Sequence, residues 1–65
     1  MNKALLEYKM KEKGKSISDM CSVLNISRSA FYRKCNGTSE FTLSEIQKIT
    51  AFLNLDSPVE IFFAH

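Results

Sequence analysis

The sequence has few of the residues on which sheet-rich or disulfide-linked small domains depend. Two glycines and one proline in 65 residues leave little turn chemistry for a many-stranded sheet. Two cysteines permit at most one disulfide, so an efficiently packed helical core is the alternative source of stability. No apolar run is long enough for a signal peptide or a membrane span. We therefore expect one cytoplasmic domain over residues 1–65, with Cys21 and Cys35 reduced and with no membrane partner.

Groups suited to catalysis or metal binding are also scarce. The single histidine, His65, has no nucleophile beside it, and the sequence contains no glycine-rich phosphate loop. Two cysteines and one histidine lack the spacing of a zinc site. A chain of this length also has no room for a second, ligand-sensing domain. We expect no enzyme, no cofactor, no metal and no small-molecule ligand.

Charge is divided unevenly along the chain. Residues 1–37 hold eight Lys/Arg against three acids, a net charge of +5, whereas residues 38–65 hold one lysine against four acids, a net charge of −3. A basic half joined to an acidic half favours a polyanion as the partner of one face. A solvated surface that is lopsided by chance is the alternative.

Capping residues divide the chain into five predicted helices. These helices cover about residues 2–13, 16–24, 27–36, 42–53 and 58–64. Ser, Thr or Pro opens each of the last four, and Gly14, Asn25 and Gly37 follow the first three as residues that tolerate a left-handed stop. Apolar residues recur at spacings of three and four, and no strand signal is present. The sequence therefore predicts an all-α domain of five short helices.

Residues 16–36 predict two short helices joined by a turn of three or four residues. Helices joined so tightly cross steeply, and the second helix then protrudes far enough to enter a DNA major groove about 12 Å wide. On this second helix Phe31 and Cys35 form the apolar side. The candidates for contacts with DNA bases lie on its other faces: Arg28, Ser29, Tyr32 and Arg33. Tyr32 at the edge of the core and Arg33 paired with a surface acid are alternatives.

Contacts to DNA phosphates are predicted at helix starts and at basic or polar side chains near the second helix. The candidates are Ser16, Ser18, Ser27, Lys34, Asn36 and Thr38. No carboxylate occurs between Cys21 and Ser39, as a surface facing phosphate requires.

The stretch from Ile26 to Lys34, followed by Asn36-Gly37, closely resembles the recognition helix of phage repressor and Cro-type (lambda-repressor-like) helix-turn-helix proteins. Small forms from phages and mobile elements of Gram-positive bacteria are especially similar, and the resemblance continues through residues 40–46 and 52–55. It implies a compact five-helix domain, operator binding and a role in transcription. This family often has a glutamine in the first turn of the second helix that touches phosphate and braces the recognition helix. Ile17 stands there, so Ser16 or Ser18 is expected to substitute.

The last predicted helix carries more apolar surface than one small core needs. Val59 and Phe62 suffice for the core, which leaves Ile61 or Phe63 for a partner chain. The predicted dimer interface consists of Ile61, Phe62 and Phe63. A helix tucked entirely into its own core is the alternative.

Together these features predict a sequence-specific regulator of transcription that binds double-stranded DNA. It is expected to act in a repressor or Cro-like manner, as a homodimer on a dyad-symmetric operator. The alternative from another class is a protein-interaction module, such as an antitoxin or an anti-repressor. A face that binds protein would more often have an apolar centre, whereas the face with Arg28 and Arg33 is polar.

Overall fold

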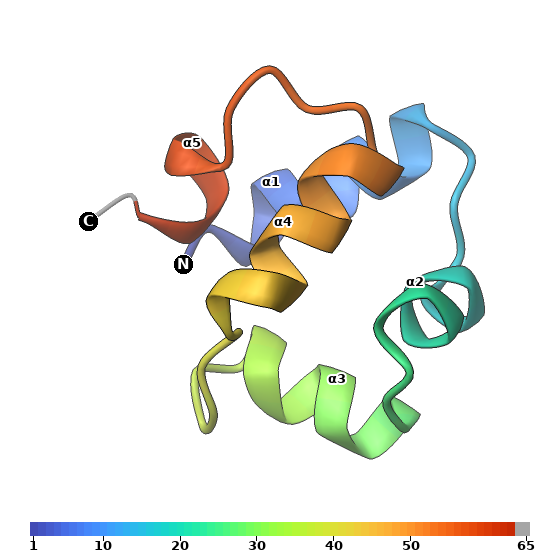
Figure 1. Ribbon diagram of the computed structural model, residues 1–65, viewed down its shortest axis with the longest axis vertical. Coiled ribbons are helices and arrows are strands. Elements are labelled where there is room, and N and C mark those ends of the chain that lie inside the picture. Colours follow the sequence, from blue (N-terminus) through green and yellow to red (C-terminus); the bar gives the residue numbers. More distant parts are fainter. Residues whose placement is uncertain (64–65) are drawn as a thin grey trace.

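The computed structural model describes residues 1–63, which form five α-helices (Figure 1). The helices are α1 (Lys3–Glu12), α2 (Ile17–Leu24), α3 (Arg28–Cys35), α4 (Leu43–Phe52) and α5 (Val59–Phe62). No strand occurs among these residues, so the predicted five-helix, all-α fold is confirmed. None of the described helices is long and apolar enough to cross a membrane.

Local side-chain caps explain where the first four helices begin. The side chains of Asn2, Ser16, Ser27 and Thr42 each accept a hydrogen bond from a backbone N–H in the first turn that follows. The starts of α2 and α4 are full capping boxes, in which the carboxylate of an acid at the third helical position also accepts a hydrogen bond from the backbone N–H of the capping residue. The predicted stop at Asn25 is confirmed by its left-handed φ of 56°, which turns the chain sharply between α2 and α3.

The helix α5 differs from its prediction. It has four residues and begins at Val59, with Pro58 in the capping position and no side-chain cap on the helix start itself. Ser57, one residue earlier, accepts a hydrogen bond from the Val59 N–H at 3.2 Å and so satisfies a backbone donor at the start of this helix. The final predicted residue of this helix, Ala64, lies outside the described residues.

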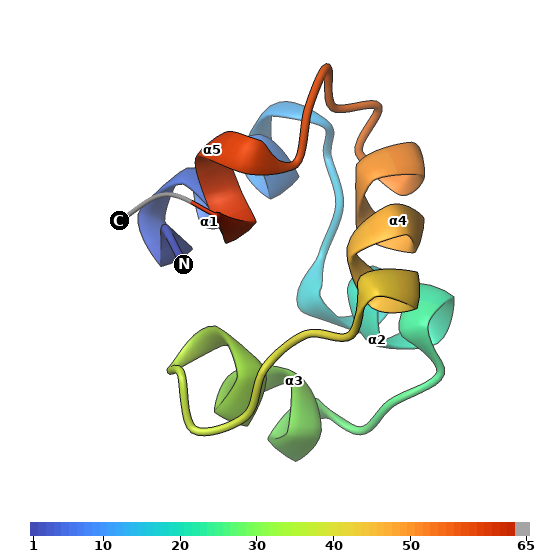
Figure 2. The ribbon, with the colours of Figure 1, turned by 60° about the vertical axis from the view of Figure 1, so that its left-hand side comes forward.

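One hydrophobic core joins all five helices. Its largest fully buried side chains are Phe31, Leu6, Met20, Ile49, Leu53 and Ile61. The helix α2 packs on both α3 and α4, and α1 packs on α5. In Figures 1 and 2, α3 lies at one end of the molecule and the connection from α4 to α5 at the other end, whereas α5 lies at one side, next to α1. The predicted burial of Phe31 and Cys35 is confirmed.

The start of the chain fixes which side of α5 is buried. The Asn2 N–H donates to the Ile61 carbonyl at 2.6 Å, and Ile61 is 1% exposed whereas Val59 is 55% exposed. The prediction that Val59 fills the core and leaves Ile61 for a partner is therefore wrong. Residues two apart on a helix point about 200° away from each other, so burying Ile61 against α1 turns both Val59 and Phe63 outward.

Candidate nucleic-acid interface

The helix α3 is anchored by one side and exposes the other. Phe31 is 1% exposed and Cys35 8%, whereas Arg28, Ser29, Tyr32 and Arg33 are all exposed. The eight residues of α3 make it about 12 Å long, comparable to the width of a DNA major groove. The structure thus brings together on one exposed helix all four residues predicted to contact bases.

The exposed ring of Tyr32 also has support from the core. It stands edge-on to the Phe31 ring, with 6.4 Å between the centroids and 67° between the planes, and Tyr32 remains 45% exposed. Core contact and exposure therefore coexist at this residue. Arg33 is not paired with an acid, since the ion pairs among residues 1–63 are Lys9–Glu12 and Lys34–Glu45.

A hydrogen bond joins the two helices of the predicted helix-turn-helix. Arg28, the first residue of α3, donates from Nη2 to Oγ of Ser18, the second residue of α2. The sequence predicted that Ser16 or Ser18 would brace the recognition helix, and Ser18 makes this contact. A guanidinium has several N–H donors in a planar fork, so one bond to Ser18 orients the group and leaves the others available.

Ser16 is committed to the cap of α2. Its Oγ accepts from the Asp19 N–H at 3.1 Å, and its own N–H donates to the Asp19 carboxylate at 2.8 Å. This backbone hydrogen bond from Ser16 holds the pKa of Asp19 below its ordinary value. An ionised carboxylate therefore stands at the positive end of α2, where it competes with any phosphate for the same helix end. The capping-box spacing was visible in the sequence, but its effect on anion binding was missed.

The ammonium of Lys34, a predicted phosphate contact, is bonded within the domain. Its ammonium donates to Oε1 of Glu45 at 2.9 Å and to the Glu40 carbonyl at 3.2 Å, and it lies 5.8 Å from the centroid of the Phe41 ring. The Lys34 side chain is only 15% exposed, and that of Glu45 12%. Lys34 therefore connects α3 to the start of α4, and its ammonium does not stand free for the predicted phosphate contact.

The remaining phosphate candidates, Ser27, Asn36 and Thr38, are all exposed. Ser27 caps α3 by accepting from the Ala30 N–H at 3.1 Å. Asn36 ends α3, and its Oδ1 accepts a hydrogen bond from the ammonium of Lys3 at 2.9 Å. Sequence reasoning missed Lys3 because it lies 33 residues from Asn36, and no local pattern relates positions so far apart.

A comparison with known protein families places the five-helix fold in a family. Residues 6–62 match the family of Cro/C1-type HTH DNA-binding domains, a stretch that includes every helix of the fold at least in part. The chain belongs to this family. It is a family of DNA-binding regulators rather than enzymes. No curated protein and no solved structure matched the chain.

In this Cro/C1-type domain the two cysteines belong to the core. Cys21 and Cys35 are free thiols, each 8% exposed, and burial raises the pKa of the Cys35 thiol to about 11. A thiol with so high a pKa is protonated and unreactive at neutral pH. Within residues 1–63 no three His, Cys, Asp or Glu side chains are grouped so that they can hold a metal ion.

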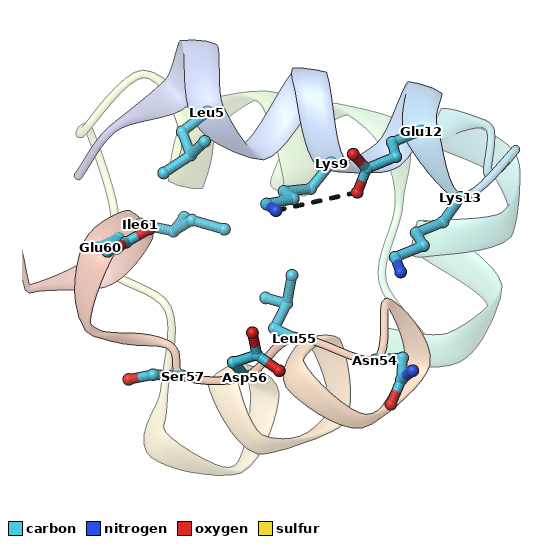
Figure 3. A pocket seen from close by; sticks show the side chains of 10 residues that line it. All are labelled: Leu5, Lys9, Glu12, Lys13, Asn54, Leu55, Asp56, Ser57, Glu60 and Ile61. Atoms are coloured by element: carbon cyan, nitrogen blue, oxygen red, sulfur yellow. Dashed lines mark ion pairs between the residues drawn. The ribbon is translucent and has the colours of Figure 1, made fainter.

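The domain also has a polar cleft (Figure 3), and none of its lining residues belongs to α2 or α3. It encloses about 370 Å³ between α1 and the segment that connects α4 to α5. Lys9, Glu12 and Lys13 line one wall, and Asp56 and Glu60 lie across from them. Lys9 pairs with Glu12 on its own helix at 3.8 Å. Because the cleft lies at the end opposite α3, its charges do not contribute to the candidate DNA interface.

Proposed function

We propose that this Cro/C1-type domain is a sequence-specific transcriptional regulator of the repressor or Cro kind, which acts in the cytoplasm on a dyad-symmetric operator in double-stranded DNA. The observation that carries the proposal is the exposed face of α3. Arg28, Ser29, Tyr32 and Arg33 lie there on a helix anchored by Phe31. The sequence has no carboxylate from Cys21 to Ser39, so no acid within this stretch opposes the approach of phosphates.

The residue types on this face suit the reading of base pairs. Arginine donates two parallel hydrogen bonds to O6 and N7 of guanine, which is the commonest specific contact in the major groove. Arg33 is unpaired among the described residues, and Arg28 is oriented by Ser18. The half-exposed ring of Tyr32 offers an apolar surface for a thymine methyl group, and the Ser29 hydroxyl donates or accepts.

We further propose that the domain binds DNA as a homodimer through α5. The exposed apolar residues here are Val59, at 55% exposure, and Phe63, which directly follows the helix, at 51%, with Phe62 partly exposed beside them. Recognition helices that meet successive major grooves lie about 34 Å apart, so each lies about 17 Å from the twofold axis. One domain extends 26 Å along its longest axis and 20 Å along its shortest, so a separation of about 17 Å between α3 and the twofold axis fits within the dimensions of one domain.

Regulation by such a dimer is steric. An occupied operator excludes polymerase or a competing regulator from the same stretch of DNA. Because the proposed chemistry involves no ligand, occupancy depends on protein concentration and on salt.

Selection from random duplexes, followed by sequencing, tests the proposal directly. We expect enrichment of a motif with two related half-sites, and binding that weakens by orders of magnitude between about 50 and 200 mM salt. Arg33→Ala is expected to lose the preference at one base position in each half-site. The absence of any enriched duplex would contradict the proposal and favour a protein-binding role. An affinity that stays flat with salt would also contradict it.

A further inference from the structure

Lys3 lies beside the end of the recognition helix, although it belongs to the first turn of α1. Its Nζ donates to Oδ1 of Asn36, the residue that caps the C-terminal end of α3, at 2.9 Å. Both residues are exposed. The ion pairs among residues 1–63 involve other lysines, so no carboxylate within 4 Å neutralises the charge of Lys3 in the described chain.

The chemistry of this contact determines what the pair offers to solvent. A lysine ammonium has only donors, so it takes the oxygen of the Asn36 amide and leaves the amide nitrogen directed elsewhere. The two N–H groups of that nitrogen and the remaining N–H groups of the ammonium are then all donors. A cluster of donors with one positive charge is complementary to a phosphate, which supplies only acceptors at neutral pH.

We propose that Lys3 and Asn36 together clamp one phosphate of the DNA backbone. In this clamp Lys3 supplies the charge, contacts the phosphate directly and holds the Asn36 amide with its nitrogen outward. The inference rests on the proposed function, since it assumes that α3 enters the major groove. It extends the DNA-contacting surface beyond α2 and α3 to the first turn of α1.

The position of the pair favours a backbone phosphate over a free anion. The helix α3 is about 12 Å long and the major groove is about 12 Å wide. A helix lying across the groove therefore ends near its edge, where the sugar-phosphate backbone runs. Asn36 lies at that end. Thr38 follows two residues later and is tied to the same helix end by its N–H bond to the Arg33 carbonyl at 2.9 Å.

The salt dependence of binding to a selected duplex tests the clamp. Each neutralised phosphate adds about 0.9 to the slope of log affinity against log salt. We expect Lys3→Met to lower the slope by about this amount, so that a rise from 50 to 200 mM salt weakens the wild type about 3.5-fold more than the variant. The preferred base sequence is expected to stay unchanged. The matched control is Lys48→Met, which removes an equal charge from an exposed position on α4 and is expected to leave the slope as it is.

A double-mutant cycle tests whether Lys3 also orients Asn36. Asn36→Ala is expected to weaken binding in the wild-type background and to weaken it less in the Lys3→Met background. Equal losses in both backgrounds would overturn the orienting role. The clamp would be overturned if Lys3→Met and Lys48→Met both kept the wild-type slope of log affinity against log salt. In either case the proposed function would stand if the wild type binds DNA in a salt-dependent manner and the Arg33→Ala variant loses its base preference.

Discussion

Arg33 and Lys34 are adjacent basic residues with different surroundings. Successive positions on a helix are turned by about 100°, so one of the two side chains faces solvent while the next meets α4. Arg33 is exposed and unpaired in the described chain, whereas Lys34 is bonded to Glu45. A formal count of positive charge treats these two residues alike, but only the charge of Arg33 is free of an ion pair within the described chain.

Alanine substitutions are expected to separate these roles. Arg33→Ala should keep the wild-type melting temperature and lose about 1–3 kcal/mol of discrimination at one base position. Lys34→Ala should lower the free energy of unfolding by about 1–3 kcal/mol, because it leaves a largely buried carboxylate without its charged donor. Thermal melting and competition binding on both variants check this. The assignment is wrong if Lys34→Ala keeps full stability and loses affinity for every duplex.

Glu45 gives stability a dependence on acid pH. Burial of its carboxyl raises the pKa, but hydrogen bonds from the Thr42 backbone N–H and the Lys34 ammonium outweigh it, and the pKa of Glu45 is lowered. A carboxyl whose pKa is lower in the folded state stabilises the fold above its unfolded pKa of about 4.3. That contribution is lost as the pH falls through the folded value.

Glu45→Gln is expected to remove this part of the acid sensitivity. Glutamine can still close the capping box at this position, but it carries no charge. The variant should be less stable than the wild type at neutral pH, and the difference should shrink as the pH falls below about 4. Urea unfolding at several pH values measures it, with the exposed Glu40→Gln as control. A constant difference at all pH values would show that the charge of Glu45 contributes nothing. Asp19, whose pKa is also lowered, titrates equally in all three proteins.

At the scale of the helices, local sequence signals predicted most of the fold. The starts of α2, α3 and α4 follow from side chains that bond within three residues of themselves, at Ser16, Ser27 and Thr42. The stop at Asn25 follows from its own tolerance of a left-handed backbone. Such features depend on neighbours in the sequence, so they can be predicted without the fold.

The features that could not be predicted depend on distant residues. The buried side of α5 is fixed by the bond between Asn2 and Ile61, and the role of Lys34 is fixed by Glu45, 11 residues away. Periodicity identifies an apolar helix but does not say which of several apolar sides meets the core when the helix is only four residues long. The exposed side of α3, in contrast, could be predicted, because this helix has eight residues and its two buried anchoring residues lie four apart on it.

The bond from Arg28 to Ser18 links the two helices that form the helix-turn-helix. If this bond orients the Arg28 guanidinium for a base contact, then Ser18→Ala should relax preference at the base position read by Arg28 and leave the position read by Arg33 unchanged. Ser18→Thr keeps a hydroxyl and is expected to restore much of the preference. Both residues are exposed, so little change in melting temperature is expected. Selection and sequencing with each variant measures this, and equal loss at both base positions would contradict it.

At the scale of the whole molecule, the uneven charge of the sequence does not map onto two faces. Lys9 and Lys13 belong to the basic first half of the chain, yet they line the cleft beside Asp56 and Glu60, at the end opposite α3 (Figure 3). Charges from the two halves of the sequence therefore mix there.

The proposed dimer is the property that depends on the whole molecule. Val59 begins α5 and Phe63 directly follows it, four residues later, with its N–H bonded to the Val59 carbonyl, so the two form one exposed apolar strip, whereas Ile61 is buried in the core of its own chain. In a twofold dimer this strip meets its own copy, so one substitution acts twice. Phe63→Glu is therefore expected to shift the protein to monomer in sedimentation, at concentrations where the wild type is a dimer, and to weaken binding to a two-half-site operator far more than to a single half-site. Leu43→Glu, at a residue 67% exposed on α4, places the same charge on an exposed apolar side chain outside α5 and should leave the dimer intact. A wild type that stays monomeric at high micromolar concentration and binds paired half-sites without cooperativity would contradict the dimer.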